Sequence, residues 1–204
     1  MKKTTITFLL LGCVAFAVPA SAVQLFDFDA QTIMPTVAGS AATVYGRIVN
    51  GAAVATPMPL DFANFEYTIV VTGLTRDTVG TVSVFSGGAV AIYQDAATPS
   101  AWATPSTFSD GTVVLSGTLA TFQRTMLTST LGSGAGIVDW TGGTMLDVLA
   151  PADRTDWPLL TSVSRAVSQV QPGFSERWDG KVEPRNDVVS EEPLSWSDLK
   201  ATFR

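Results

Sequence analysis

Carboxylates are the side chains best suited to acid–base chemistry in this chain, because its 204 residues include no histidine. That absence excludes Ser-His-Asp and Cys-His catalysis and any zinc or copper site with histidine ligands. A glycan hydrolase or lyase would need two carboxylates placed across a sugar with separated pKa values. The candidates are Glu66, Asp95, Asp110, Asp139 and Asp147, and their spacing singles out no pair. The sequence therefore assigns no catalytic residue and predicts no cofactor.

Tryptophan is the second residue type with a chemical use, since an exposed indole face can stack on a sugar ring. Four of the five tryptophans lie in or near predicted loops, and three of them are Trp102, Trp140 and Trp178. They are the candidate ligand-binding residues, with a glycan as the ligand. The alternative is that these rings cap the open ends of a hydrophobic core.

Three aspartates are candidates for a calcium site. Asp27 and Asp29 are two residues apart and share one face of a predicted strand, while Asp139 lies in a glycine-rich stretch. Carboxylate oxygens are the hard ligands that Ca²⁺ requires. The alternative for the first two is a solvated edge strand that its charges protect from aggregation. The ligand spacing of known calcium loops is absent, so no metal site is assigned.

The N-terminal stretch 1–22 has the pattern of a secretory signal peptide. Lys2 and Lys3 precede a short apolar run, and the stretch 20–22 gives a small-residue cleavage site before Val23. Lipidation at Cys13 is the alternative, because the preceding Leu-Leu-Gly resembles a lipobox. Cleavage after Ala22 leaves a mature chain, 23–204, that contains no cysteine. We expect this mature chain in the periplasm, on the cell surface or outside the cell.

Charge restricts the possible partners. The net charge of −6 becomes −8 when Lys2 and Lys3 are removed, and an acidic surface opposes binding to nucleic acid or anionic lipid. No apolar run in the mature chain reaches the length of about 20 residues that a transmembrane helix needs. We therefore expect no nucleic-acid partner and no transmembrane segment.

Alternation of apolar and polar residues predicts an all-β fold. The clearest strands are 23–29, 42–49, 64–74 and 112–122, and turn residues punctuate the chain. Ser86-Gly87-Gly88 and Asp179-Gly180 predict tight hairpins, and the glycines of 132–136 predict a loop. The expected architecture is an antiparallel β-sandwich over residues 23–183, with jelly-roll and immunoglobulin-like topologies both open.

Residues 184–204 form a separate segment, a charged and proline-bounded linker followed by a short amphipathic stretch. Trp196, Leu199 and Phe203 would share one face of a helix. So short a stretch does not hold a helix alone in water. This C-terminal segment is therefore predicted to be either a short helix or a disordered tail. As an interaction tail, it would dock on its own domain or bind a partner.

The stretch 88–117 contains IYQD, a loop rich in Ala, Thr, Ser and Pro, and then TFSDGTVVLSG. In these features it resembles exported bacterial β-sandwich proteins of the PEP-CTERM-associated kind. The resemblance implies a surface or matrix component. The C-terminal Pro-Glu-Pro signal, apolar span and basic end of such proteins are missing here, and no functional residue is carried over.

Together these observations favour an exported, non-enzymatic structural or interaction protein of the cell envelope or extracellular matrix. Its partner would be a second copy of itself or another envelope protein. A carbohydrate-binding module that uses loop tryptophans is the first alternative, and a carboxylate-based glycan hydrolase or lyase is the second.

Overall fold

The computed structural model of the protein describes residues 24–49, 56–96 and 98–183. The predicted signal peptide and the predicted C-terminal segment 184–204 lie outside these residues. No helix within the described ranges is long and apolar enough to cross a membrane.

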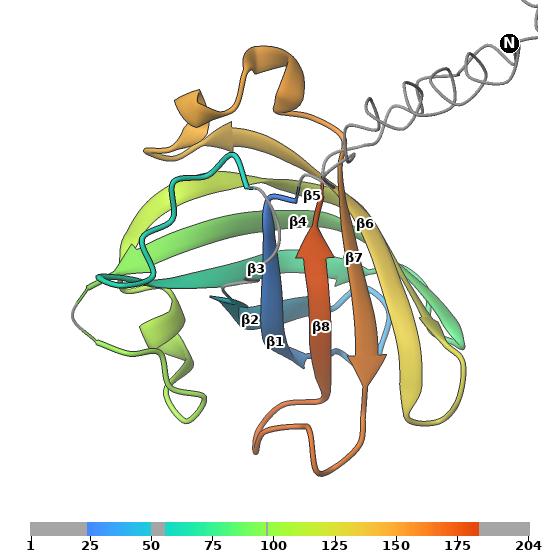
Figure 1. The fold of residues 1–204 in the computed structure, drawn as a ribbon. Coiled ribbons are helices and arrows are strands. Elements are labelled where there is room, and N and C mark those ends of the chain that lie inside the picture. Colours follow the sequence, from blue (N-terminus) through green and yellow to red (C-terminus); the bar gives the residue numbers. More distant parts are fainter. Residues whose placement is uncertain (1–23, 50–55, 97, 184–204) are drawn as a thin grey trace, which may run out of the picture.

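Eight antiparallel strands form one closed barrel (Figure 1). In chain order they are β1 (Phe26–Ile33), β2 (Ala41–Val49), β3 (Glu66–Arg76), β4 (Val82–Asp95), β5 (Thr112–Met126), β6 (Leu131–Gly142), β7 (Trp157–Ser164) and β8 (Glu176–Val182). Each strand pairs with its neighbours in the sequence, and β8 returns to lie beside β1. The connections include three short 3₁₀ turns, η1 (Pro105–Phe108), η2 (Leu146–Val148) and η3 (Pro151–Asp153).

The predicted β-sandwich is wrong, although the all-β antiparallel class is confirmed. The first and last strands are paired from Phe26 opposite Val182 to Thr32 opposite Glu176, which closes a single sheet. A sandwich and a barrel both produce alternating inward and outward residues, so alternation alone does not separate them. The distinguishing contact lies between the two ends of the described chain, which no local pattern reveals.

The early strands alternate between inward and outward residues. Val44 and Ile48 of β2, together with Tyr67 and Ile69 of β3, point into the barrel and are buried. Gly46 lies between Val44 and Ile48 on β2, where the strand comes close to Ala30 of β1. An added Cβ would be 2.7 Å from the Cβ of Ala30. An eight-stranded barrel has an interior just wide enough for side chains to fill. This interior is occupied by large rings, among them Phe28, Phe85, Phe122, Trp140 and Trp178.

Three glycine-based predictions are wrong, because these glycines lie within strands, where Gly134 and Gly180 admit neighbouring rings. The predicted hairpin at 86–88 lies within the continuous strand β4, and the one at Asp179-Gly180 lies within β8. The predicted loop 132–136 is part of β6. A Cβ on Gly134 would be 2.3 Å from Cζ of Phe122, and one on Gly180 would be 2.6 Å from Cζ of Phe28.

The two ends of the barrel differ in chemistry. One end, the Trp140 rim, receives the start of β1 and the end of β8 and is packed with apolar residues such as Leu25, Met58 and Leu149. The opposite end, the Arg124 rim, contains buried polar side chains from the end of β5 and the start of β8. The chain therefore closes one end with apolar packing and the other with a charged network.

Two loops cover the outer wall of β1–β3. The β4–β5 loop is fixed by Ser100, which binds Arg47 and Glu66, and by the carbonyl of Phe108, which accepts a hydrogen bond from Thr68 at 2.7 Å. The β7–β8 loop is fixed by Gln31, whose amide donates to the carbonyl of Gln169 at 3.1 Å. Among the described residues, these loops leave the outer wall from β8 to β5 uncovered.

Candidate functional site

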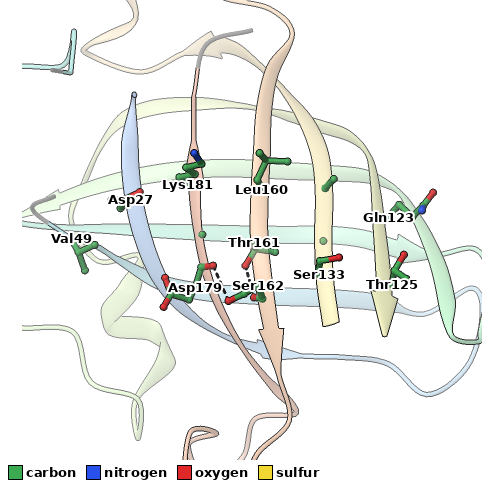
Figure 2. Close-up of a pocket in the computed structure, with 13 residues that line it drawn as sticks. Asp27, Val49, Gln123, Thr125, Ser133, Leu160, Thr161, Ser162, Asp179 and Lys181 are labelled. Atoms are coloured by element: carbon green, nitrogen blue, oxygen red, sulfur yellow. Dashed lines mark hydrogen bonds between the residues drawn. The ribbon is translucent and has the colours of Figure 1, made fainter. Parts of the chain in front are cut away.

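A hollow of 720 Å³ lies on the uncovered outer wall, and we call it the outer hollow (Figure 2). Residues of six strands line it, with β8 and β7 at its centre. The lining side chains point away from the barrel interior, except at glycine and Thr161, where the backbone forms the floor. The hollow is therefore a feature of the surface and is separate from the filled interior.

Strand register arranges the outward side chains of this wall in two rows, and all of them except Asp29 line the hollow. The first row runs from β2 to β5 through Val49, Asp27, Lys181, Leu160, Ala135 and Gln123. The second row, two residues closer to the Arg124 rim, runs from β1 to β5 through Asp29, Asp179, Ser162, Ser133 and Thr125. Cross-strand neighbours in such rows are about 4.5–5.5 Å apart at Cβ, so each row is a continuous strip of side chains. Figure 2 shows the labelled members of both rows.

The β1–β8 side of the outer hollow is ionic. Arg177 binds Asp29 at 2.8 Å and Asp179 at 3.3 Å. The hydrogen bond from Arg177 to Asp29 is the largest cause that raises the pKa of this guanidinium above its ordinary value. Lys181 lies in the first row and pairs with Glu183 at 2.6 Å. Asp29 and Asp179 lie opposite each other on the adjacent strands β1 and β8, and Arg177 binds both carboxylates.

The β5–β7 side of the outer hollow is uncharged. Ser162, Ser133, Thr125 and Gln123 present hydroxyl and amide groups, and the Ser162 hydroxyl donates to the carbonyl of Asp179 at 3.2 Å. Leu160 contributes an apolar surface at the centre and is 36% exposed. The hollow thus combines charged groups, hydroxyls and an apolar centre. This composition is suited to contact with the surface of another macromolecule.

The hollow has a stiff floor because the wall rests directly on aromatic rings of the core. Phe122 lies against Gly134, and its ring stacks on that of Trp178 with centroids 4.6 Å apart. Phe28 lies against Gly180 in the same way. Interior packing of this density leaves the backbone little freedom to move inward, so the lining residues keep their spacing.

The three candidate glycan-binding tryptophans are not brought together. Trp140 and Trp178 are inside the barrel, only 2% and 1% exposed, so their faces are not available to a sugar. Trp102 is partly exposed in the β4–β5 loop, where it packs on Phe108 with centroids 4.6 Å apart. Arg47 lies 5.1 Å from the Trp102 ring, and Phe174 of the β7–β8 loop packs on its edge. Trp102 therefore joins the two covering loops.

The candidate calcium residues are also separated. Asp29 is bound to Arg177, while Asp139 accepts a hydrogen bond from the backbone of Asp156 at 2.8 Å. Asp27 points into the outer hollow from β1. Within the described ranges, no three acidic, cysteine or histidine side chains are grouped closely enough to hold a metal ion.

Two of the candidate catalytic carboxylates are neighbours at the Trp140 rim. Glu66 and Asp95 face each other in the β3–β4 register and line a second depression of 470 Å³, together with Phe62 and Phe65. Both oxygens of Glu66 are engaged by Ser100, and Arg47 lies 3.4 Å away. Asp95 accepts a hydrogen bond from the backbone of Thr98 at 3.3 Å. These carboxylates are thus engaged in fixing the β4–β5 loop.

A buried charge network that the sequence did not indicate lies at the Arg124 rim. Arg124 binds Glu176 at 2.5 Å inside the barrel, and Arg165 binds the same oxygen at 2.6 Å. Ser83 connects this pair to Arg76 by hydrogen bonds of 3.1 and 2.8 Å. Burial is the largest influence on the Arg124 guanidinium and lowers its pKa, because the charged form loses hydration.

Sequence reasoning missed most of the outer hollow because its lining is mainly serine, threonine, glycine and apolar residues, which form no motif typical of a binding site. Ser162, Leu160 and Asp179 would have been found by extending strict alternation through β7 and β8, but Asp179-Gly180 was interpreted as a turn. No protein-family model, curated protein or solved structure matches the chain. The support for the site is therefore its geometry.

Proposed function

We propose that this chain is an exported, non-enzymatic interaction protein of the cell envelope or extracellular matrix, and that it docks its partner in the outer hollow. The observation that carries the proposal is the hollow itself, where two rows of charged, hydroxyl and apolar side chains lie on a stiff and uncovered wall. The signal-peptide pattern of the N-terminal stretch 1–22 supports export.

The filled interior supports a surface function over the carriage of a small ligand. Barrels that carry ligands keep a cavity among the inward-facing residues. Here Trp140, Trp178 and Phe122 occupy the interior, each 2% exposed or less. A partner would therefore meet the outside of this barrel.

The state of the carboxylates supports a non-enzymatic role. Glu176, the most deeply buried, is neutralised by Arg124 and Arg165. Glu66 is held by Ser100, and Asp29 by Arg177. A general acid or base must come within hydrogen-bond reach of the substrate, whereas these three carboxylates are already bound by side chains of the barrel and its loops.

Charge in the hollow indicates the chemistry of the partner. The partner would contact Asp27, Asp179 and Lys181 on one side and hydroxyl groups on the other, so it should be polar and carry charges of both signs. Exposed pairs of this kind are screened by salt, and we expect retention in the envelope to weaken as ionic strength rises.

Cell fractionation of two matched variants tests the proposal. Leu160→Glu places a charge at the centre of the outer hollow, whereas Ile137→Glu places one on β6 outside the hollow at nearly the same exposure, 37% against 36%. We expect Leu160→Glu to move the protein from the envelope or matrix fraction to the soluble fraction, while Ile137→Glu stays with the wild type. Equal distribution of both variants and the wild type would refute docking in the hollow.

A further inference from the structure

We propose that the Arg124 rim docks on the surface of a lipid bilayer, and that the loops at this end of the barrel place aliphatic side chains in the apolar boundary of the lipid. None of these side chains lines the outer hollow or the second depression. The rim is therefore a binding surface distinct from the partner site proposed above.

Exposed large apolar side chains gather at the Arg124 rim. Of the eleven among the described residues, seven lie at this end of the barrel. Four of them, which we call the tip residues, belong to the β1–β2, β3–β4, β5–β6 and β7–β8 loops, one to each loop, and they are Val37, Val79, Leu127 and Val167. The other three are at adjoining strand ends: Ile33, Val82 and Leu131.

The topology brings the four tip residues to one end of the molecule. Consecutive strands are antiparallel, so every second connection lies at the same rim (Figure 1). Each tip residue is at least 55% exposed. Single exposed apolar residues are common on protein surfaces, whereas their concentration on one face marks an interaction surface.

The loops that carry the tip residues are uncharged. The stretches 34–40, 78–81, 127–130 and 166–175 contain no Asp, Glu, Lys or Arg, although charged residues make up 15% of the chain. Connections at the Trp140 rim, by contrast, carry several aspartates, including Asp61, Asp110 and Asp147. The acidic charge that opposes lipid binding is thus kept away from the Arg124 rim, and uncharged loops enter an apolar boundary at a lower cost.

Hydrogen bonds fix the loops in the form that exposes the tip residues. The guanidinium of Arg76 donates to the carbonyls of Pro35 and Thr78, in the loops of Val37 and Val79. In the β5–β6 loop, the amide of Leu127 donates to the carbonyl of Leu131 at 2.8 Å. Because these groups are already paired, docking neither strips them of water without a partner nor has to order the loops.

The chemistry of the tip residues favours lipid over a protein partner. Contacts that dominate protein interfaces are enriched in Trp, Tyr and Arg and fill pockets in the partner. The tip residues are valine and leucine on four separate loops around the mouth of a barrel. A fluid lipid surface can accept such dispersed side chains without matching pockets, and binding of this kind grows with the apolar area buried.

Flotation with lipid vesicles tests the surface. The protein is the mature chain recovered after export, free of the apolar run in the stretch 1–22, and the vesicles contain equal parts of phosphatidylcholine and phosphatidylethanolamine. We expect the wild type to float with the vesicles. Leu127→Asp with Val167→Asp should bind at least about tenfold more weakly, because two apolar contacts are lost and two charges are added.

A second double variant controls for the added charge. Ile137→Asp with Val148→Asp also changes two exposed apolar residues, which lie away from the Arg124 rim, and should bind vesicles as the wild type does. Added salt should not release the wild type, since apolar contacts are not screened. Absence of wild-type binding, or equal binding of the two double variants, would overturn the proposal.

A fluorescent label locates the contact. The mature chain from Val23 contains no cysteine, so a single environment-sensitive dye can be attached at a chosen position. On Leu127→Cys or Val79→Cys, its emission should shift to the blue when vesicles are added, while on Val148→Cys it should not change. No shift at Leu127 and Val79, or an equal shift at Val148, would show that the rim does not meet the lipid.

Self-association through the rim is the competing use of the tip residues. Light scattering without lipid should give the same mass for the wild type and for Leu127→Asp with Val167→Asp. A wild-type assembly that this double variant abolishes, together with no vesicle binding, would make the rim a protein interface and refute the proposal.

This proposal and the proposed function fail in distinguishable ways. Flotation uses only purified protein and lipid, so its failure refutes the lipid contact and leaves the fractionation of Leu160→Glu to be judged separately. Equal fractionation of Leu160→Glu and Ile137→Glu, with vesicle binding intact, would refute docking in the outer hollow alone.

Discussion

The Arg124 guanidinium lies 2.5 Å from the Glu176 carboxylate inside the barrel, and each side chain is only 1% exposed. This pair joins β5 to β8 across the interior, and it is extended by Ser83 of β4 and by Arg165, the residue that follows β7. Two arginines, Arg124 and Arg165, thus bind one carboxylate at this rim, and Arg76 joins the network through Ser83. The stability of the Arg124 rim depends on that carboxylate.

Replacing Glu176 with Gln should strongly destabilise the barrel. The substitution keeps the side-chain volume but leaves the Arg124 charge buried without its counter-ion, which typically costs about 3–5 kcal/mol. Urea unfolding monitored by circular dichroism measures the free energy of unfolding. Asp29→Asn is the control, because it breaks the partly exposed pair with Arg177, a type worth about 0–1 kcal/mol. Equal losses in the two variants would contradict the importance of the buried network.

Adding a methyl group at Gly134 should disturb the wall beneath the outer hollow. The new Cβ would lie 2.3 Å from Cζ of Phe122, and overpacking of this kind costs about 1–3 kcal/mol. Thermal or urea unfolding of Gly134→Ala measures this loss, with Ala135→Val on the outward face as the control. Adding Phe122→Leu to Gly134→Ala should recover part of the loss. No recovery would show that the ring is not the cause.

Replacing Trp102 with Ala should loosen the β4–β5 loop. The change removes the ring contact with Phe108 and the cation–π contact with Arg47, together worth about 1–3 kcal/mol. Hydrogen exchange at the Ser100 amide, which donates to Glu66, should accelerate. Trp102→Phe keeps an aromatic ring and should show a smaller effect. Unchanged exchange at Ser100 in Trp102→Ala would show that the ring does not fix the loop.

The backbone amides of β1 and β8 should be as well protected from hydrogen exchange as those of the rest of the sheet. Both strands are paired on two sides, so their amides should exchange with solvent as slowly as those of β3 and β4. Native-state hydrogen exchange measures this by strand. Fast exchange confined to β1 and β8 would indicate an open sheet.

The mature protein should begin at Val23. Intact-mass spectrometry of protein recovered from the producing cells distinguishes this start from a chain lipidated at Cys13, which would keep the stretch 13–22 and gain the mass of the acyl groups. A mass that includes the whole stretch 1–22 would contradict export by a cleaved leader.

Local alternation was sufficient to predict much of the sheet. The predicted strands 42–49 and 64–74 lie within about two residues of β2 and β3. Sheet closure was not predictable in this way, because Phe26 and Val182 are brought together only by the sum of all strand tilts.

Glycine limited the sequence-based interpretation of β6 and β8. A glycine in a sequence usually indicates a turn, yet Gly134 and Gly180 lie within strands, where they accommodate the rings of Phe122 and Phe28. The same error hid Asp179, because a strand interpreted as a turn has no outward face. Arg124 and Glu176 could not be paired from the sequence, since 52 residues separate them.

Closure of the barrel also determines how copies of this protein can associate. β1 was interpreted as an edge strand whose aspartates prevent aggregation, but it pairs with both β2 and β8. Without a free edge, the sheet offers no row of unpaired backbone groups to which another chain could add a strand. The charges of Asp27 and Asp29 are therefore not needed to block such addition. Copies of the protein would have to meet through side chains of their walls and loops.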